Sequence, residues 1–359
     1  METLLGIDIG TSGTKTALYR ADGQRVAAHT EEYPMAQPHN GWAEQDPADW
    51  WHAVRIGVRA VLSDAAAQGA SMPAAIGLSG QMHGLVLLDA EGGVLRPSIL
   101  WCDQRTGAET LEMEEVFGRQ RIIEVTANPP MTGFTAAKIR WVQKHEPEIW
   151  ARTAHILLPK DYIRFLLCGS FVSDVSDASG MQLMDVSARG WSDEMLRGLA
   201  IERDRLPELC ESQDISGHVT AEAAAATGLP QGTPVVGGAG DNAAAAVGMG
   251  VVRAGSAFTS LGSSAVIYCV SDELRIDPEG RVHSLCASVP GKWTFMSCTQ
   301  AAGLSVQWFR DNFCADLADG AASGAGAYKF LDAEAAKIPP GADRLLYLPY
   351  LMGERSPHP

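Results

Sequence analysis

The sequence lacks the features of several protein classes. Its seven cysteines are odd in number and no two are spaced as CxxC, so neither a disulfide framework nor a zinc cage is expected, and reduced thiols in a cytoplasm fit best. Basic residues are few: 28 Lys and Arg against 43 Asp and Glu give a net charge of −15, so no nucleic-acid partner is expected. No apolar run is long enough for a membrane span and no secretory leader precedes the first strand, so no membrane partner is expected.

What is present describes a globular chain with more than one core. Its 359 residues exceed one typical domain, so two domains are expected. A hydrophobic content of 46% is typical of a folded, water-soluble protein.

The first informative stretch is a Gly-rich turn between two short strands. An apolar strand ends at Ile9, and a second strand leaves through Lys15 to Tyr19. Gly10 and Gly13 allow positive φ and close approach of a ligand, and the backbone N–H groups of such a turn can bind phosphate oxygens. The residues proposed to bind phosphate are Gly10, Thr11, Ser12, Thr14 and Lys15. The order Gly-Lys-Ser/Thr of a Walker A loop is absent, and an ordinary hairpin is the alternative.

Asp8 is unusual within its apolar strand. An ionised carboxylate there is costly unless it is hydrogen-bonded, paired or bound to a cation. Mg²⁺ on the phosphates of a nucleotide would meet that need, which favours a functional role for Asp8.

The order of elements at the start of the chain indicates the fold. Two strands flank the turn, a third is predicted over 25–33, a helix begins at Pro47 after an Asp46 cap, and a strand follows over 74–79. The helix is expected to bury one face, formed by Trp51, Val54, Val58, Val61 and Leu62. Three strands, a helix and a strand open the actin-like, ribonuclease-H-like α/β ATPase fold.

Two polar stretches follow strands in the next part of the chain. His83 lies between Gly80 and Gly84, which favours a site residue over a core histidine held by a backbone carbonyl. Trp101 could stack on the apolar face of a polyhydroxylated ligand. For Asp103 and Arg105, a ligand contact and a local ion pair remain equal alternatives. The polar loop over 173–180 is interpreted as Asx and Ser turns rather than as catalytic.

Asp241 is the candidate catalytic base. The strand over 234–236 ends in glycines, and Asp241 then begins a helix. Asp241 could be a helix cap, but the glycines clear space for a ligand beside a carboxylate able to accept a hydroxyl proton. A second Gly-Ser-Ser hairpin turn, Gly262, Ser263 and Ser264, could hold phosphates from the opposite side.

These motifs together resemble those of the FGGY family of sugar kinases. The matching stretches run in the family's order through the chain: Gly6–Ser12, Gly41–Pro47, Gly80–Gly84, Trp101–Arg105, Leu158–Tyr162, Gly238–Asn242 and Tyr350–Pro357. The resemblance implies phosphorylation of a sugar by ATP with Mg²⁺, and the Gln81–Gly84 stretch points within the family to the 5-hydroxyl of D-xylulose.

The resemblance also implies roles and domains. Asp241 would be the general base, Asp8 would orient Mg²⁺, and the two Gly-rich turns would embrace the phosphates. The sugar would contact Met82, His83, Trp101, Asp103, Asp241 and Asn242. Residues 1–250 would form the sugar-binding domain and 251–359 the start of the nucleotide-binding domain, across a cleft. Family members are longer, so the second domain is expected to be incomplete.

Several alternatives stay open at this stage. The chain could act on L-ribulose or glycerol, against which the Gln81–Gly84 stretch argues, or it could bind a sugar without catalysis. A homodimer is a further alternative that the sequence leaves open.

Overall fold

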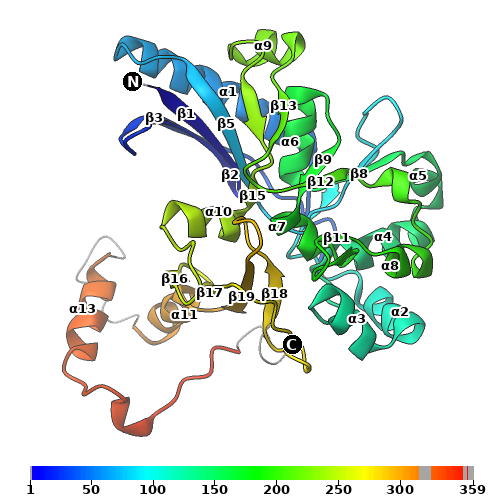
Figure 1. Ribbon diagram of the computed structural model, residues 1–359. Coiled ribbons are helices and arrows are strands. Elements are labelled where there is room, and N and C mark those ends of the chain that lie inside the picture. Colours follow the sequence, from blue (N-terminus) through cyan, green and yellow to red (C-terminus); the bar gives the residue numbers. More distant parts are fainter. Residues whose placement is uncertain (1, 315–324, 351–353, 355–359) are drawn as a thin grey trace. The chain divides into compact units, whose positions relative to one another are not determined.

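The computed structural model describes residues 2–314, 325–350 and Glu354 (Figure 1). The chain divides into two compact units. Unit 1 comprises Met1–Ser256 and Val270–Phe295, and unit 2 comprises Ala257–Cys269 and Met296–Pro359. The predicted domain boundary at residue 250 stays a prediction.

Unit 1 is built on a mixed sheet in the strand order β13-β14-β5-β1-β2-β3, with β15 paired to β5 beside this path. The strands are β1 (Thr3–Ile9), β2 (Gly13–Arg20), β3 (Arg25–Glu32), β5 (Pro73–Gly80), β13 (Ile215–His218), β14 (Pro234–Val236) and β15 (Ala239–Gly240). β1, β2 and β3 are antiparallel neighbours, whereas β5 runs parallel to β1. The predicted order of three strands, a helix and a strand is therefore confirmed.

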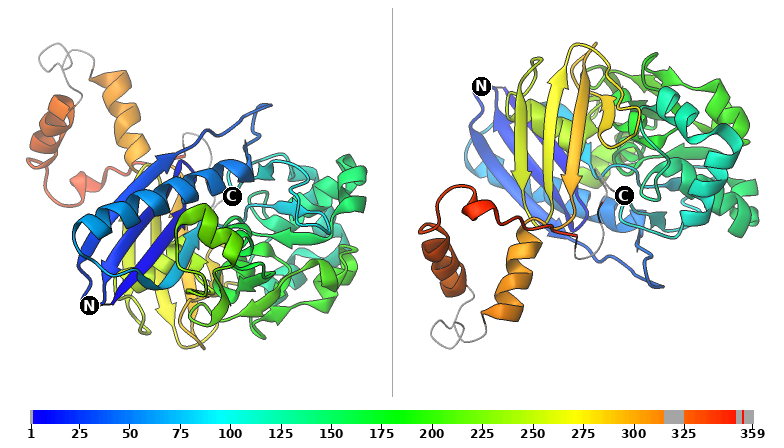
Figure 2. Two further views of the ribbon diagram at one scale, coloured as in Figure 1. Left: turned by 90° about the horizontal axis from the view of Figure 1, so that it is seen from above. Right: turned by 90° about the horizontal axis from the view of Figure 1, so that it is seen from below.

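Alternation along β1 gives the sheet two different faces. Leu5, Ile7 and Ile9 are buried, while Gly6 and Asp8 between them are partly exposed. The buried side packs against α1 (Pro47–Ala67), which lies along the sheet in Figure 2. The other face of β1 therefore carries Asp8.

Local sequence explains how α1 begins. Asp46 accepts a hydrogen bond from the backbone N–H of Ala48 at 2.9 Å, and Pro47 occupies the first turn, as predicted. Trp50 is fully buried, whereas Trp51 is only partly buried. At the N-terminal end of α1, the buried residue is therefore Trp50 and not the predicted Trp51.

The rest of unit 1 is mainly helical. Its longer elements are α2 (Gly107–Phe117), α3 (Arg119–Thr126), α4 (Thr135–His145), α5 (Pro147–Arg152), α6 (Pro159–Cys168), α7 (Val175–Ala178), α8 (Asp193–Gly198), α9 (Ala221–Thr227) and α10 (Asp241–Gly248). Most of these helices share a second hydrophobic core, whereas α6 and α9 pack into the core that contains α1. Short strands join them: β4 (Glu44–Gln45), β6 (Val86–Leu88), β7 (Ser98–Ile99), β8 (His155–Leu157), β9 (Val172–Asp174), β10 (Met184–Asp185), β11 (Gly190–Trp191), β12 (Glu208–Cys210) and β18 (His283–Cys286).

Unit 2 contains the second predicted hairpin. β16 (Ala257–Leu261) pairs with β17 (Ala265–Ser271), so the Gly262-Ser263-Ser264 turn forms as expected. β19 (Trp293–Thr299), like β17, crosses the boundary between the units, and α11 (Gly303–Phe313) and α13 (Ala325–Ala335) follow. None of the helices in the described ranges is both long and apolar enough to cross a membrane.

The last matching stretch, Tyr350–Pro357, lies mostly outside the described residues. Of its acidic and basic residues only Glu354 is described, and its carboxylate accepts hydrogen bonds from Thr299 Oγ1 at 2.6 Å and from the Gln300 backbone at 3.0 Å.

Candidate active site

Three parallel strands of unit 1 end side by side. In the strand register, Asp8 of β1 lies beside Ser79 of β5, and Ser79 lies beside Ala239 of β15. Each of these three residues is one position before the last residue of its strand. Neighbouring strands lie about 4.8 Å apart, so Asp8 and Ala239, on opposite sides of β5, are about 10 Å apart. Asp241 directly follows Gly240, and Asp8 and Asp241 therefore share one edge of the sheet.

Asp8 faces open space. Its side chain is partly exposed, and its Oδ1 accepts a hydrogen bond from Ser79 Oγ at 2.9 Å. It lines a cavity of about 430 Å³ on the sheet face opposite α1, together with Lys15, Ser79, Ala239 and Ala244. Lys15 is also the direct cross-strand neighbour of Asp8, so a cation and an anion stand side by side at this wall.

The Gly-rich turn is tight, but not for the expected reason. Neither Gly10 nor Gly13 adopts a positive φ, so that part of the prediction is wrong. Gly13 is needed because a Cβ there would lie 2.7 Å from the carbonyl oxygen of Glu31 on β3. The turn is closed by a hydrogen bond from Gly10 N to Gly13 O at 3.1 Å.

The hydroxyls of the turn differ in their availability. Thr14 is buried and donates to the Tyr33 hydroxyl at 3.4 Å. Thr11 donates to Gln81 Oε1 at 3.3 Å and accepts from the Trp101 indole at 2.9 Å. Ser12 is exposed. Of the three predicted hydroxyls, that of Ser12 is therefore the most accessible to a phosphate.

Asp241 is the first residue of α10 rather than its cap. Gly240 holds the cap position and provides no side-chain hydrogen bond, so the cap alternative does not describe Asp241. Its Oδ1 accepts from Asn242 N at 2.6 Å and from Asn242 Nδ2 at 2.9 Å.

The surroundings of Asp241 bring its titration close to neutrality. Although its side chain is partly exposed, loss of hydration among nearby protein atoms raises the pKa of Asp241 to about 6. The charge of Asp8 acts in the same direction, and the Asn242 hydrogen bonds act against it. A carboxylate with this pKa can accept a proton near pH 7.

Met82 and His83 lie next to the segment that precedes Asp241. A Cβ on Gly240 would be 2.9 Å from Met82 Cγ, so the absent side chain makes room for Met82. His83 is buried with φ of 66°, and its Nδ1 lies 2.9 Å from the carbonyl oxygen of Gly180. This is the contact expected for a core histidine, and a sugar contact by either residue stays a prediction.

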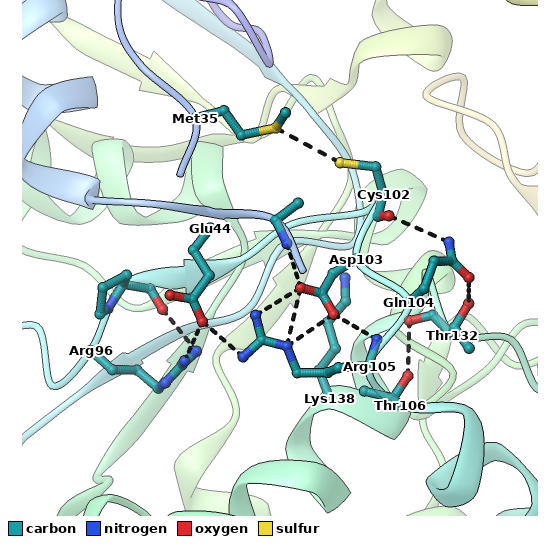
Figure 3. Close-up of polar contacts among 12 residues, drawn as sticks. Met35, Glu44, Arg96, Cys102, Asp103, Gln104, Arg105, Thr106, Thr132 and Lys138 are labelled. Atoms are coloured by element: carbon teal, nitrogen blue, oxygen red, sulfur yellow. Dashed lines mark hydrogen bonds and ion pairs between the residues drawn. The ribbon is translucent and has the colours of Figure 1, made fainter. Parts of the chain in front are cut away.

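Asp103 belongs to a buried ion-pair network, drawn in Figure 3. Its Oδ2 accepts from Ala43 N at 2.6 Å and from Arg105 Nη2 at 2.7 Å, and the residue is fully buried. Arg105 also pairs with Glu44 at 2.8 Å and stacks over the Trp42 ring at 3.6 Å. The geometry therefore favours the local ion pair over the predicted sugar contact of Asp103.

The second hairpin turn is described within unit 2. Ser263 O accepts from Ala302 N at 2.8 Å and from Leu304 N at 3.1 Å, and Gly262 O accepts from Gly303 N at 2.9 Å. The start of α11 thus holds the backbone of the turn. Binding of phosphate by Gly262, Ser263 and Ser264 stays a prediction.

Sequence reasoning missed a buried charge cluster, formed by Lys160, Asp161, Arg164, Asp174 and Asp177. Lys160 Nζ lies 2.6 Å from Asp161 Oδ1 and 2.7 Å from Asp174 Oδ1. Charged residues are almost never fully buried unless paired. The Lys-Asp pair in the matching stretch 158–162 and the acidic loop 173–180 were signals, but nothing in the sequence indicated that they meet.

Comparisons with known proteins agree with these features. The description "FGGY family of carbohydrate kinases, N-terminal domain" matches residues 3–248. Xylulose kinase from Escherichia coli (strain K12) is 43% identical over 99% of this chain and 70% of its own length.

Solved structures give the same result for the fold. A structure titled as a xyloylose kinase from Brucella ovis is 40% identical with a TM-score of 0.90, over 99% of this chain and 70% of that one. Xylulose kinase from Rhodospirillum rubrum is 34% identical with a TM-score of 0.92, over 98% of this chain and 70% of that one. The likeness confirms the predicted actin-like α/β fold.

Proposed function

Because this chain belongs to the FGGY family of carbohydrate kinases, we propose that it transfers the γ-phosphoryl group of ATP to the 5-hydroxyl of D-xylulose. The products are D-xylulose 5-phosphate and ADP. Similarity to xylulose kinases along nearly the whole chain supports this choice of sugar. The observation that supports this chemistry is the setting of Asp241. Its pKa is raised to about 6, and it directly follows strand β15, at the same edge of the sheet as Asp8.

Asp241 would act as the general base. Its carboxylate accepts the proton as the O–H bond of the sugar hydroxyl breaks and an O–P bond forms to the γ-phosphorus. The bond from that phosphorus to the bridging oxygen of ADP breaks in the same transfer. Asn242 holds the carboxylate through its backbone and side-chain N–H groups, which limits the rotation of Asp241.

The residues around Asp8 fit Mg²⁺ delivered with ATP. Asp8 is partly exposed to the cavity, and Ser79 is the one residue in the described ranges that donates a hydrogen bond to its side chain. In the described part of the chain, no group of three or more His, Cys, Asp or Glu gathers to hold a metal by itself. Mg²⁺ usually binds through one or two carboxylates together with substrate phosphates and water, and when bound it neutralises phosphate charge.

The remaining contacts follow from position. The backbone of the Gly10–Thr14 turn, exposed Ser12 and Lys15 would bind phosphate oxygens. Ser263 and Ser264, in the turn of the second hairpin, would also bind phosphate oxygens. Met82, His83 and Asn242 would contact the sugar, and the Trp101 ring would cover its apolar face while its indole stays bonded to Thr11.

Release of ADP with each candidate sugar tests the proposal. The protein is mixed with Mg·ATP and D-xylulose, L-ribulose or glycerol, with a sugar-free sample as the control. We expect ADP release above the control to be fastest with D-xylulose. Faster ADP release with L-ribulose or glycerol would identify that compound, rather than D-xylulose, as the substrate. A D-xylulose-dependent rise in the thermal midpoint without ADP release would favour a sugar-binding protein without catalysis. Cytoplasmic location and a homodimer stay predictions.

A further inference from the structure

The glycine segment Gly237–Gly240 connects β14 to Asp241 and has little freedom to move. Gly238 has a φ of +70°, and a Cβ there would lie 2.2 Å from the carbonyl oxygen of Leu78. A Cβ on Gly237 would lie 2.6 Å from the carbonyl oxygen of Glu211. The backbone before Asp241 is therefore closely packed against neighbouring backbone. Its position depends on the groups that form hydrogen bonds with it.

The buried charge cluster and Ser176, which is bonded to it, contact both ends of this segment. At the start, Arg164 Nη2 donates to the carbonyl oxygen of Gly237, while Arg164 Nη1 pairs with Asp161 at 2.8 Å. At the end, Ser176 Oγ donates to Asp174 Oδ2 at 2.5 Å and accepts from the backbone N–H of Gly240 at 3.4 Å. Gly240 is the residue directly before Asp241.

Gly238, in the middle of the glycine segment, is linked through Ser212 to the same charge cluster. Gly238 N donates to the carbonyl oxygen of Ser212 at 2.9 Å, and Ser212 Oγ donates to Asp174 Oδ2 at 2.9 Å. Asp174 in turn pairs with Lys160 at 2.7 Å. The segment is thus tied to fixed charges along its length.

The cluster combines charges of both signs. Lys160 and Arg164 bring two positive charges, and Asp161, Asp174 and Asp177 could bring three negative ones. Burial, followed by the charges of Asp161 and Asp174, raises the pKa of Asp177 well above its ordinary value despite Lys160 at 3.4 Å. The opposite charges of the cluster lie in close contact, which offsets part of the cost of burying them.

We infer that Arg164 and Ser176 are positioning residues that fix the glycine segment and thereby hold the Asp241 carboxylate in line with the sugar hydroxyl. The inference rests on the proposed function for its catalytic part. The anchoring itself depends only on contacts within unit 1. A shift of about 1 Å in a catalytic group can cost about 10²-fold in rate, so loss of one anchor has a measurable effect.

Ser176→Ala tests the anchor, and Ser173→Ala is the matched control. Ser176→Ala removes the hydroxyl that bonds to Gly240, while the Asp174 cap on Ser176 N at 2.9 Å remains. Ser173 is equally buried and donates to Asp161 Oδ2 at 2.6 Å in the same cluster, but it has no described bond to the glycine segment. Both variants lose one buried hydroxyl, so they share any general loss of stability.

Steady-state kinetics and amide hydrogen exchange are measured on both variants. For Ser176→Ala we expect kcat to fall about 10-fold, with a much smaller change in the KM for D-xylulose, and exchange in the peptide over 237–243 to become faster. Ser173→Ala should keep kcat and the exchange of that peptide near wild type. Arg164→Lys, which keeps the charge but loses the forked donor, should resemble Ser176→Ala if it folds.

Two results would overturn the inference: equal loss of kcat in Ser176→Ala and Ser173→Ala, or wild-type exchange over 237–243 in Ser176→Ala. Failure of the wild-type protein to phosphorylate D-xylulose would refute the proposed function instead. The exchange measurement then still decides whether Ser176 anchors the segment.

Discussion

Asp8 and Asp241 lie at the same edge of the sheet, on the two sides of strand β5, and the charge of Asp8 contributes to the raised pKa of Asp241. Their settings differ. Asp8 is partly exposed and bonded to Ser79, whereas Asp241 loses hydration and is bonded to its own neighbour, Asn242. Two carboxylates in different surroundings can have different roles in one reaction, one binding the metal ion and the other accepting the proton.

The pH dependence of catalysis follows from Asp241. Because the base must be ionised and its pKa is about 6, kcat/KM for D-xylulose should fall about tenfold per pH unit below pH 6 and level off above pH 7. Initial rates from pH 4.5 to 8 at fixed free Mg²⁺ measure this. A profile that stays flat down to pH 5 would contradict the assignment.

Asp241→Asn should also change the pH dependence of stability. The folded-state pKa is raised, so the wild-type protein binds a proton more tightly when folded and loses stability as pH rises from about 4 through about 6. The variant has no carboxyl group to ionise there. Its thermal midpoint should exceed that of wild type at pH 8, with a difference that shrinks towards pH 4. A constant difference over this range would argue against the raised pKa.

Asp8→Asn should impair the use of Mg·ATP and leave sugar binding intact. Loss of one metal-binding charge is expected to lower kcat/KM for Mg·ATP by about 10²-fold. The rise in thermal midpoint with D-xylulose alone should remain. Asp64→Asn, an exposed aspartate on α1, serves as the control and should leave both measurements unchanged. Unchanged Mg·ATP kinetics in Asp8→Asn would refute the metal role.

Asp103→Asn should affect stability more than sugar binding. It removes one member of a buried ion pair and leaves Arg105 with Glu44, so a loss of about 3 kcal/mol in the free energy of unfolding is expected. Glu114→Gln breaks the exposed pair with Arg119 and should cost less than about 1 kcal/mol. An Asp103→Asn protein that is as stable as wild type, but whose thermal midpoint no longer rises with D-xylulose, would contradict the structural role of Asp103.

The sequence predicted the parts of this structure that depend on neighbouring residues. The apolar strand that leads into the Gly-rich turn and the cap at Asp46 are local signals, and both led to correct elements. The glycines before Asp241 correctly indicated a strand that ends at a helix start.

The rest depends on contacts between distant residues. Gly13 is required because its backbone lies close to the carbonyl oxygen of Glu31 on another strand, a contact that the residues around Gly13 in the sequence do not indicate. Asp103 was left undecided because its partner Ala43 is 60 residues away in the chain. The segment over 173–180, interpreted as a polar loop of Asx and Ser turns, instead forms the end of β9, helix α7 and a 3-10 turn, with Asp174 as the cap of α7. The contact between Asp174 and Lys160 becomes apparent only in the folded chain.

The proposed phosphoryl transfer with Asp241 as general base is tested by following the formation of D-xylulose 5-phosphate by phosphorus NMR in wild type and Asp241→Ala. With D-xylulose and Mg·ATP, we expect a sugar phosphate monoester and ADP in equal amounts from wild type, and a rate about 10²- to 10⁴-fold lower from Asp241→Ala. The variant should keep its fold. No ester from wild type, or an undiminished rate in the variant, would contradict the account.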